Sequence, residues 1–119
     1  MTAAVSYDSN KGALLVELPA REDYAALLDT THNLVGQLHE RTCAKLYVDA
    51  RQIELELSIS QTFHLVTAVV DTVPRGLRVA VAARPAHRLM VEFAQVAAAH
   101  RGVLLQIFDS PGEALGWLA

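Results

Sequence analysis

Charged and hydroxyl side chains gather directly after three apolar segments of the chain. In order along the sequence they are Asp49, Arg51, Ser58, Ser60, then Arg84, His87, Arg88, and finally Asp109 and Ser110. Arginine side chains brought together can hold a phosphate or a carboxylate, because each guanidinium group offers two parallel N–H donors. The alternative is a solvated edge, in which Asp49 pairs with Arg51 or Arg84 and contributes about 0–1 kcal/mol.

The remaining reactive side chains do not follow a catalytic or metal-binding pattern. His32 and His39 are seven residues apart and lack the i, i+4 pair of a helical metal site. Ser60, His64 and Asp49 contain the residue types of a hydrolase triad, but no GxSxG turn follows an apolar run. Neither GxGxxG nor a P-loop occurs in the sequence. We therefore expect no catalytic residues, no metal and no cofactor, and the chain is not predicted to be an enzyme.

The overall composition excludes several classes of partner and location. The formal net charge of −3 provides no broad cationic surface for nucleic acid. The N-terminus MTAAVSYDSN lacks the basic and apolar regions of a signal peptide, and the single Cys43 cannot form an internal disulfide. The apolar run LRVAVAA (77–83) is far shorter than the roughly 20 residues that cross a bilayer. These features predict a cytoplasmic protein without a transmembrane segment, in which Cys43 is a buried apolar filler.

The polar residues can act together only if the apolar segments are neighbouring strands. AAVSYD (3–8) and GALLVEL (12–18) are predicted to form a hairpin, in which Gly12 takes a positive φ. Apolar residues at helical spacing predict a helix over 22–40, followed by a strand over 44–50.

The second half of the chain repeats this alternation. Ser58 and Gln61 have the spacing of a capping box and predict a second helix with Phe63 on its inner face. A strand follows at 77–83, and Pro85 is well placed as the first residue of a third helix. We expect this helix to turn four residues inward, namely Leu89, Phe93, Val96 and Ala97.

A last strand and helix close the sequence. The strand is predicted over 103–108, and Ser110, Pro111 and Glu113 supply the cap, first-turn proline and capping-box acid of the final helix. Trp117 in this helix is expected to cover the sheet rather than to serve as a partner contact.

The order ββαβαβαβα predicts an α/β fold, with a mixed, mostly parallel five-stranded sheet and four helices in a single domain over residues 1–119. In such a sheet the residues after the parallel strands share one rim, where ligands commonly bind. The segment 51–57 is open to two interpretations, a loop or a short extra element, because ELEL (54–57) alternates like a strand.

The ending GVLLQIFDSPGEALGWLA, together with LYVDARQ (46–52), resembles the SpoIIAA-like proteins, a bacterial group described with the STAS domain (sulphate transporter and anti-sigma factor antagonist). The matching positions are Gly102, Phe108, Ala114, Leu115, Trp117 and Leu118. The resemblance implies the STAS-like fold and a non-enzymatic regulatory or protein-interaction domain. It also implies an alternative, a binding protein for a small apolar or anionic, lipid-like ligand beside Arg51, Arg84, His87 and Arg88.

The resemblance also points to a serine at the start of the second helix. Anti-sigma factor antagonists carry a phosphorylatable serine in an Asp-Ser-Ser/Ala-Gly stretch, and Ser58 or Ser60 lies at that place in ELELSISQTF. The flanking Asp and Gly are absent here, so a cap at Ser58 is favoured over a phosphorylation switch. The partner protein is not identified by the sequence. A homodimer is a further expectation, because amphipathic helices often hide an apolar face against a second copy.

Overall fold

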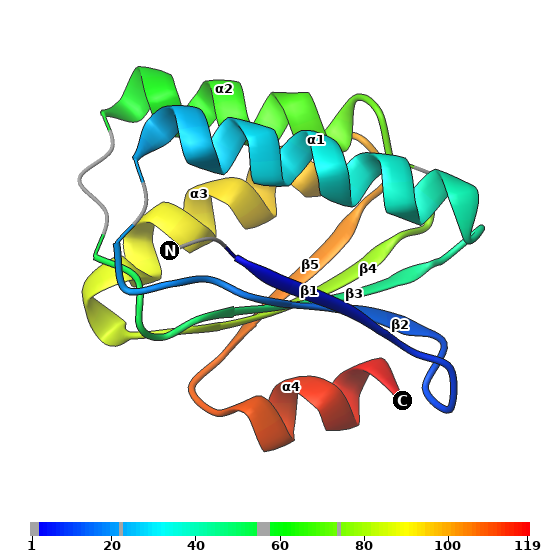
Figure 1. Cartoon of the computed structure of the whole chain (residues 1–119). Coiled ribbons are helices and arrows are strands. Elements are labelled where there is room, and N and C mark those ends of the chain that lie inside the picture. Colours follow the sequence, from blue (N-terminus) through cyan, green and yellow to red (C-terminus); the bar gives the residue numbers. More distant parts are fainter. Residues whose placement is uncertain (1–2, 22, 55–57, 74) are drawn as a thin grey trace.

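The computed structural model describes residues 3–21, 23–54, 58–73 and 75–119 (Figure 1). The elements in chain order are β1 (Ala4–Asp8), β2 (Ala13–Glu17), α1 (Tyr24–Glu40), β3 (Lys45–Ala50), α2 (Ile59–Val70), β4 (Arg78–Ala83), a 3₁₀ turn (Pro85–His87), α3 (Arg88–Ala99), β5 (Leu104–Phe108) and α4 (Pro111–Leu118). The predicted order of strands and helices is confirmed. Part of the 51–57 segment, residues 55–57, lies outside the described residues.

The five strands form one sheet in the order β1-β2-β3-β4-β5. β1 pairs with β2 in the antiparallel direction, and β2, β3, β4 and β5 are parallel. Crossovers of one hand that always advance in the same direction leave their helices on one face of the sheet. Accordingly α1, α2 and α3 cover one face, and α4 alone lies against the other (Figure 1).

The local signals that start the elements act as the sequence predicts. Gly12 has φ +63°, which allows the tight turn between β1 and β2. Ser58 Oγ accepts a hydrogen bond from Gln61 N (3.0 Å), and Gln61 Oε1 accepts one from Ser58 N (3.1 Å), completing the capping box of α2. Ser110 caps α4 through Glu113 N. The first four backbone N–H groups of any α-helix lack a carbonyl partner within the helix. In α2 and α4 the capping serine accepts a hydrogen bond from one of these groups.

The main core lies between the sheet and the three-helix layer. Its fully buried side chains include Leu14, Val16, Leu38 and Leu77. Cys43 is buried in the same cluster, with Sγ 3.1 Å from the Lys45 carbonyl oxygen. The prediction of a buried, apolar Cys43 is therefore confirmed.

The third helix differs from the prediction in its start and in its rotation. Pro85 opens the 3₁₀ turn, and α3 itself begins at Arg88. Leu89 is 82% exposed, Val96 60% and Phe93 39%, so the predicted inward orientation of these three side chains is wrong. The sheet-facing side of α3 instead carries Val91, which packs on the core, and the fully buried Ala98.

α2 agrees with the predicted orientation only in part. Phe63, predicted on the inner face, is 50% exposed. Val66, from the same predicted apolar run, packs against the core together with Val69. Large apolar side chains of both helices are therefore left facing solvent.

Trp117 covers the second face of the sheet, as predicted. Its ring lies 5.8 Å from the Phe108 ring, and the Arg78 guanidinium lies 4.5 Å from the indole centroid. Arg78 Nη2 also donates a hydrogen bond to the Trp117 carbonyl oxygen. Together these contacts attach the C-terminal end of α4 to the start of β4.

We expect Arg78→Ala to lower the free energy of unfolding by about 1–2 kcal/mol, because it removes a cation–π contact and a charge-assisted hydrogen bond. Arg78→Met should lose less, since its side chain keeps the apolar contact with the ring. Urea unfolding followed by the fluorescence of the single tryptophan measures both effects. Arg75→Ala, at an exposed residue, is the matched control. Unchanged stability in Arg78→Ala would mean that α4 is held in another way.

Candidate functional site

The ends of β3, β4 and β5 are level with one another at one edge of the sheet. Asp49 pairs in register with Ala82, and Ala82 pairs with Phe108. The polar residues at this edge line hollows on two faces of the sheet. Asp49 lines a cleft with Leu115 of α4, whereas His87 lines a cavity on the side of α2 and α3.

On the α4 side of the sheet, Asp49 forms an ion pair with Arg51, which is one of the two partners predicted for it. Arg51 Nε lies 3.0 Å from Asp49 Oδ1 and Nη2 lies 2.9 Å from Oδ2, while Arg51 N donates to Oδ1 at 3.1 Å. Only 8% of Asp49 is exposed. The hydrogen bonds from Arg51 lower the pKa of the Asp49 carboxyl below its ordinary value, against the opposing effect of burial. The carboxylate is thus fixed as an anion at the end of β3.

Tyr47, which the sequence reasoning missed, is the second buried polar residue of this cleft. The cleft has a volume of about 200 Å³ and is lined on its polar side by Ser6, Glu17, Tyr47 and Asp49. Tyr47 is 7% exposed, and its hydroxyl has no hydrogen bond of good geometry among the described residues. Burial, and then the nearby Asp49 carboxylate, raise the pKa of Tyr47 to about 12. The sequence does contain a signal for Tyr47. It lies two residues before Asp49 in LYVDARQ, and residues two apart share one face of a strand.

The residues predicted after β4, namely Arg84, His87 and Arg88, each have different surroundings. Arg84 Nη2 donates to the Ile53 carbonyl oxygen at 2.8 Å. Arg88 pairs with Glu92 at 3.4 Å and with Asp109 at 3.6 Å. His87 Nδ1 is buried without a hydrogen-bond partner in the described ranges. Arg88, at the start of α3, thus contacts Asp109, the residue after β5.

The two candidate phosphorylation sites differ in their surroundings. Ser58 takes part in the capping box, whereas Ser60 is exposed one turn before Phe63. Phosphorylation of either residue stays a prediction. His64 packs against the Tyr24 ring at 6.4 Å, and Asp49 is held by Arg51, so these two members of the hypothetical triad have other partners.

A metal site and a membrane-spanning helix each require particular features of the described residues. Residues 3–21, 23–54, 58–73 and 75–119 contain no group of three His, Cys, Asp or Glu side chains placed to hold a metal ion. Within the same ranges, every helix is too short or too polar to cross a membrane.

Two adjoining apolar cavities lie between the sheet and the helix layer. The inner cavity measures about 210 Å³ and the outer one about 230 Å³. They share Leu65, Val66 and Ala94 in their linings, together with side chains from α1 and the sheet. We call them the helix-side cavities. They arise because short side chains such as Val66 and Ala94 fill positions between α2, α3 and the strands.

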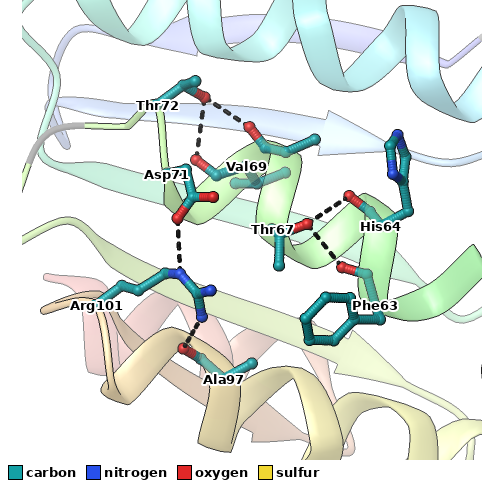
Figure 2. A network of polar contacts seen from close by, with 9 residues as sticks. Phe63, His64, Thr67, Val69, Asp71, Thr72, Ala97 and Arg101 are labelled. Atoms are coloured by element: carbon teal, nitrogen blue, oxygen red, sulfur yellow. Dashed lines mark hydrogen bonds and ion pairs between the residues drawn. The ribbon is translucent and has the colours of Figure 1, made fainter. Parts of the chain in front are cut away.

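The outer surface of α2 and α3 is unusually apolar. It consists of Phe63, Leu89, Phe93 and Val96, and we call it the α2–α3 apolar surface. The Phe63 and Phe93 rings lie 6.4 Å apart. Figure 2 shows Phe63 pointing from α2 toward α3, and Arg101 reaching Asp71 at the end of α2, where Nε lies 2.6 Å from Oδ1. The ion pair between Asp71 and Arg101 therefore joins the C-terminal ends of the two helices that carry these apolar side chains.

We expect Arg51→Ala to lower the free energy of unfolding by about 1–2 kcal/mol at pH 7, because Asp49 keeps its buried charge and loses its partner. The folded-state pKa of Asp49 lies below the unfolded value, so the pair stabilises the fold above about pH 4 and this contribution disappears as the pH falls through the folded-state pKa. Urea unfolding at pH 7 and pH 3 measures the difference. An equal loss at both pH values would contradict the ion-pair assignment, and Arg75→Ala serves as the control.

Tyr47→Phe should leave stability at pH 7 unchanged or raise it, because the lost hydroxyl makes no hydrogen bond of good geometry with the described residues. The folded-state pKa of Tyr47 is raised, so its contribution is present below about pH 10 and disappears as the pH rises toward 12, a loss of about 2–3 kcal/mol. Unfolding of the wild type and Tyr47→Phe at pH 8, 10 and 11.5 checks the difference between them. A destabilised variant at pH 7 would show that the hydroxyl is satisfied in solution.

Comparison with known proteins gives a result for the fold alone. The sequence matches no protein-family model, and it has no significant match among curated proteins. The crystal structure of an anti-sigma factor antagonist from Mycobacterium paratuberculosis is similar, with a TM-score of 0.69 over 98% of this chain and 92% of that chain, at 16% sequence identity. The STAS-like fold that the resemblance implied is therefore confirmed: the chain has the fold of an anti-sigma factor antagonist.

Proposed function

We propose that this chain is a non-enzymatic regulatory domain that acts in the bacterial cytoplasm through contact with another protein. The observation that carries the proposal is the α2–α3 apolar surface. The structural likeness to an anti-sigma factor antagonist supports it, because that neighbour is a regulatory protein of the same fold.

The composition of the surface suits a protein partner. Phe63 and Phe93 offer two aromatic anchors, and Leu89 and Val96 extend the contact by one helical turn on either side. Aromatic side chains at the centre of a patch contribute most to protein association, while a polar border excludes water. Here the border includes the ion pair of Arg88 with Glu92. We propose a partner that inserts an apolar helix face between α2 and α3.

Ser60 lies at the edge of this surface. It is exposed and precedes Phe63 by three residues on α2, so the two side chains fall on neighbouring positions of the helix. A phosphate there would place about two negative charges beside an apolar contact and would oppose docking. Ser58 is less suited to such a role, because its hydroxyl oxygen accepts the capping hydrogen bond from Gln61 N.

The test uses Leu89→Asp, in the first turn of α3, where a carboxylate interacts favourably with the helix dipole and should not unfold the helix. A protein captured from lysate of the native host would be purified, and its affinity measured by calorimetry. We expect Leu89→Asp to weaken binding by at least about tenfold, because a charge would be buried in the contact. Ala25→Asp, at an exposed position of α1, should bind like the wild type.

Light scattering of the wild type and Leu89→Asp distinguishes a second copy of the chain from a different partner. A wild-type monomer agrees with the proposal. A wild-type dimer that dissociates in Leu89→Asp would assign the surface to a homodimer and overturn docking of another protein there. Equal binding of the captured protein by Leu89→Asp and wild type would do the same.

A further inference from the structure

The cleft on the α4 side of the sheet is not used by the proposed docking surface, which lies on the helices that cover the other face. The cleft measures about 200 Å³. It opens over β1 and β2, because α4 packs on β3, β4 and β5. We propose that the cleft binds a primary ammonium group on a short aliphatic chain, with the ammonium group between Glu17 and the Tyr47 hydroxyl. The site is independent of the proposed function.

Strand register brings the polar side chains of the cleft together. Glu17 on β2 pairs with Asp49 on β3, and Leu15 on β2 pairs with Tyr47. Ser6 on β1 pairs with Leu15, so it extends the second of these rows. Residues that are opposite each other in a sheet, or two apart in one strand, share a face. The two carboxylates and two hydroxyls that line the cleft therefore belong to one part of the sheet.

The cleft has an excess of negative charge. Two carboxylates line it, and the Arg51 guanidinium beside it is bonded to Asp49. In the ranges that the structure describes, no ion pair joins Glu17 to a Lys, Arg or His side chain. Like charges directly opposite each other on adjacent strands repel. A cation beside Glu17 would reduce this repulsion, so the cleft favours a ligand with a positive charge.

The buried hydroxyl of Tyr47 lies beside these charges. Tyr47 is 7% exposed, and within the described part of the chain its hydroxyl makes no hydrogen bond of good geometry. Burial first, and then the Asp49 and Glu17 carboxylates, raise the pKa of Tyr47 to about 12, so the hydroxyl end of the ring lies on the acidic side of the cleft. The Asp49 carboxylate attracts the hydroxyl proton and leaves the phenolic oxygen as an acceptor. A ligand with N–H donors would satisfy that oxygen.

The rest of the lining determines what carries the ammonium group. Each polar side chain of the cleft can accept a hydrogen bond, and the aliphatic residues Ala4, Leu15 and Leu115 complete the walls. A primary ammonium group supplies three donors and one positive charge, and a chain of a few carbons covers the aliphatic residues. A metal ion would leave the aliphatic walls without contact, and a carboxylate would be repelled. Free amines and lysine side chains share the required chemistry.

The experiment measures the binding of pentylamine, pentan-1-ol and trimethylpentylammonium at pH 7 by titration of two-dimensional NMR spectra. We expect pentylamine to bind with a Kd on the order of 1 mM, as suits a ligand of this size. It should shift the backbone signals of Glu17, Tyr47 and Asp49 and not those of the α2–α3 apolar surface. Pentanol lacks the charge and the quaternary ion lacks N–H donors, so each should bind at least about fivefold more weakly.

A second titration distinguishes the two sources of the ammonium group. The peptide acetyl-Gly-Lys-Gly-amide presents a lysine side chain to the cleft. Tighter binding of pentylamine than of the peptide would assign the site to a free amine. Tighter binding of the peptide would assign it to a lysine of a partner protein. Both results support an ammonium site, whereas binding of neither ligand would overturn it.

The variant arm uses Glu17→Gln and Tyr47→Phe, with Glu40→Gln, exposed at the end of α1, as the matched control. Glu17→Gln should weaken pentylamine at least about fivefold and Tyr47→Phe about threefold, without an effect on pentanol. Ser6→Ala, which removes the exposed hydroxyl of the cleft, replaces Tyr47→Phe if that variant does not fold. Equal affinity for pentylamine and pentanol, or wild-type affinity in Glu17→Gln, would overturn the proposal. Leu89→Asp should bind pentylamine normally, so failure of the docking surface and failure of this site give different results.

Discussion

Each parallel strand of this protein lies beside the strand that precedes it in the chain, so the sheet grows from β2 to β5 in a single direction. This order decides on which face of the sheet the helices and the polar residues lie. Because β2, β3, β4 and β5 are neighbours in chain order, the three crossover helices fall on the same face. A sheet wound in two directions has a crevice where the strand order reverses, and ligands bind there. In this sheet the parallel order does not reverse. The polar residues at this edge divide between two faces: Tyr47 and Asp49 of β3 line the cleft on the α4 side, and His87 lines the cavity on the side of the helix layer.

The space beneath the helix layer is filled least well below α2. None of the side chains of α2 whose burial the structure describes is fully buried, and its contacts with the core come from Val66 and Val69. The capping box at Ser58 is local to the helix, whereas the ion pair of Asp71 with Arg101 joins its C-terminal end to the segment that follows α3. The small inward residues of α2 explain why cavities persist below it.

Elements whose boundaries depend on local chemistry could be predicted from the sequence. The positive φ of Gly12 and the caps at Ser58 and Ser110 depend on residues within a few positions, so pattern and structure agree. The rotation of α3 could not be predicted in full. Arg88, Glu92 and Gln95 of RLMVEFAQVAAA mark one polar stripe, but apolar residues cover the rest of the circumference, so the pattern does not choose which of them face the sheet. The large residues Leu89 and Phe93 appeared to mark the inner face.

The inner face of α3 was decided by the space available rather than by hydrophobicity. Ala98, with a small side chain, is buried against the sheet, and this allows close approach of α3 to the strands. The sequence predicted the local contacts of the candidate site but not its arrangement across the sheet. Pairing of Asp49 with Arg51 follows from neighbouring positions, but the separation of Asp49 from His87 depends on which face each strand residue takes after the sheet has formed. The signal for Tyr47 is not separate from that of its strand, because the alternation of LYVDARQ is also that of an ordinary half-buried strand.

α2 contributes to both sides of the helix layer. Val66 on its inner side lines both cavities, while Phe63 on its outer side belongs to the α2–α3 apolar surface. The inner contacts of α2 with the core come from Val66 and Val69, and none of its side chains whose burial the structure describes is fully buried. A partner that docks on Phe63 and Phe93 would therefore add apolar contacts to the helix that has few of its own, and aromatic anchors of this kind contribute most to association.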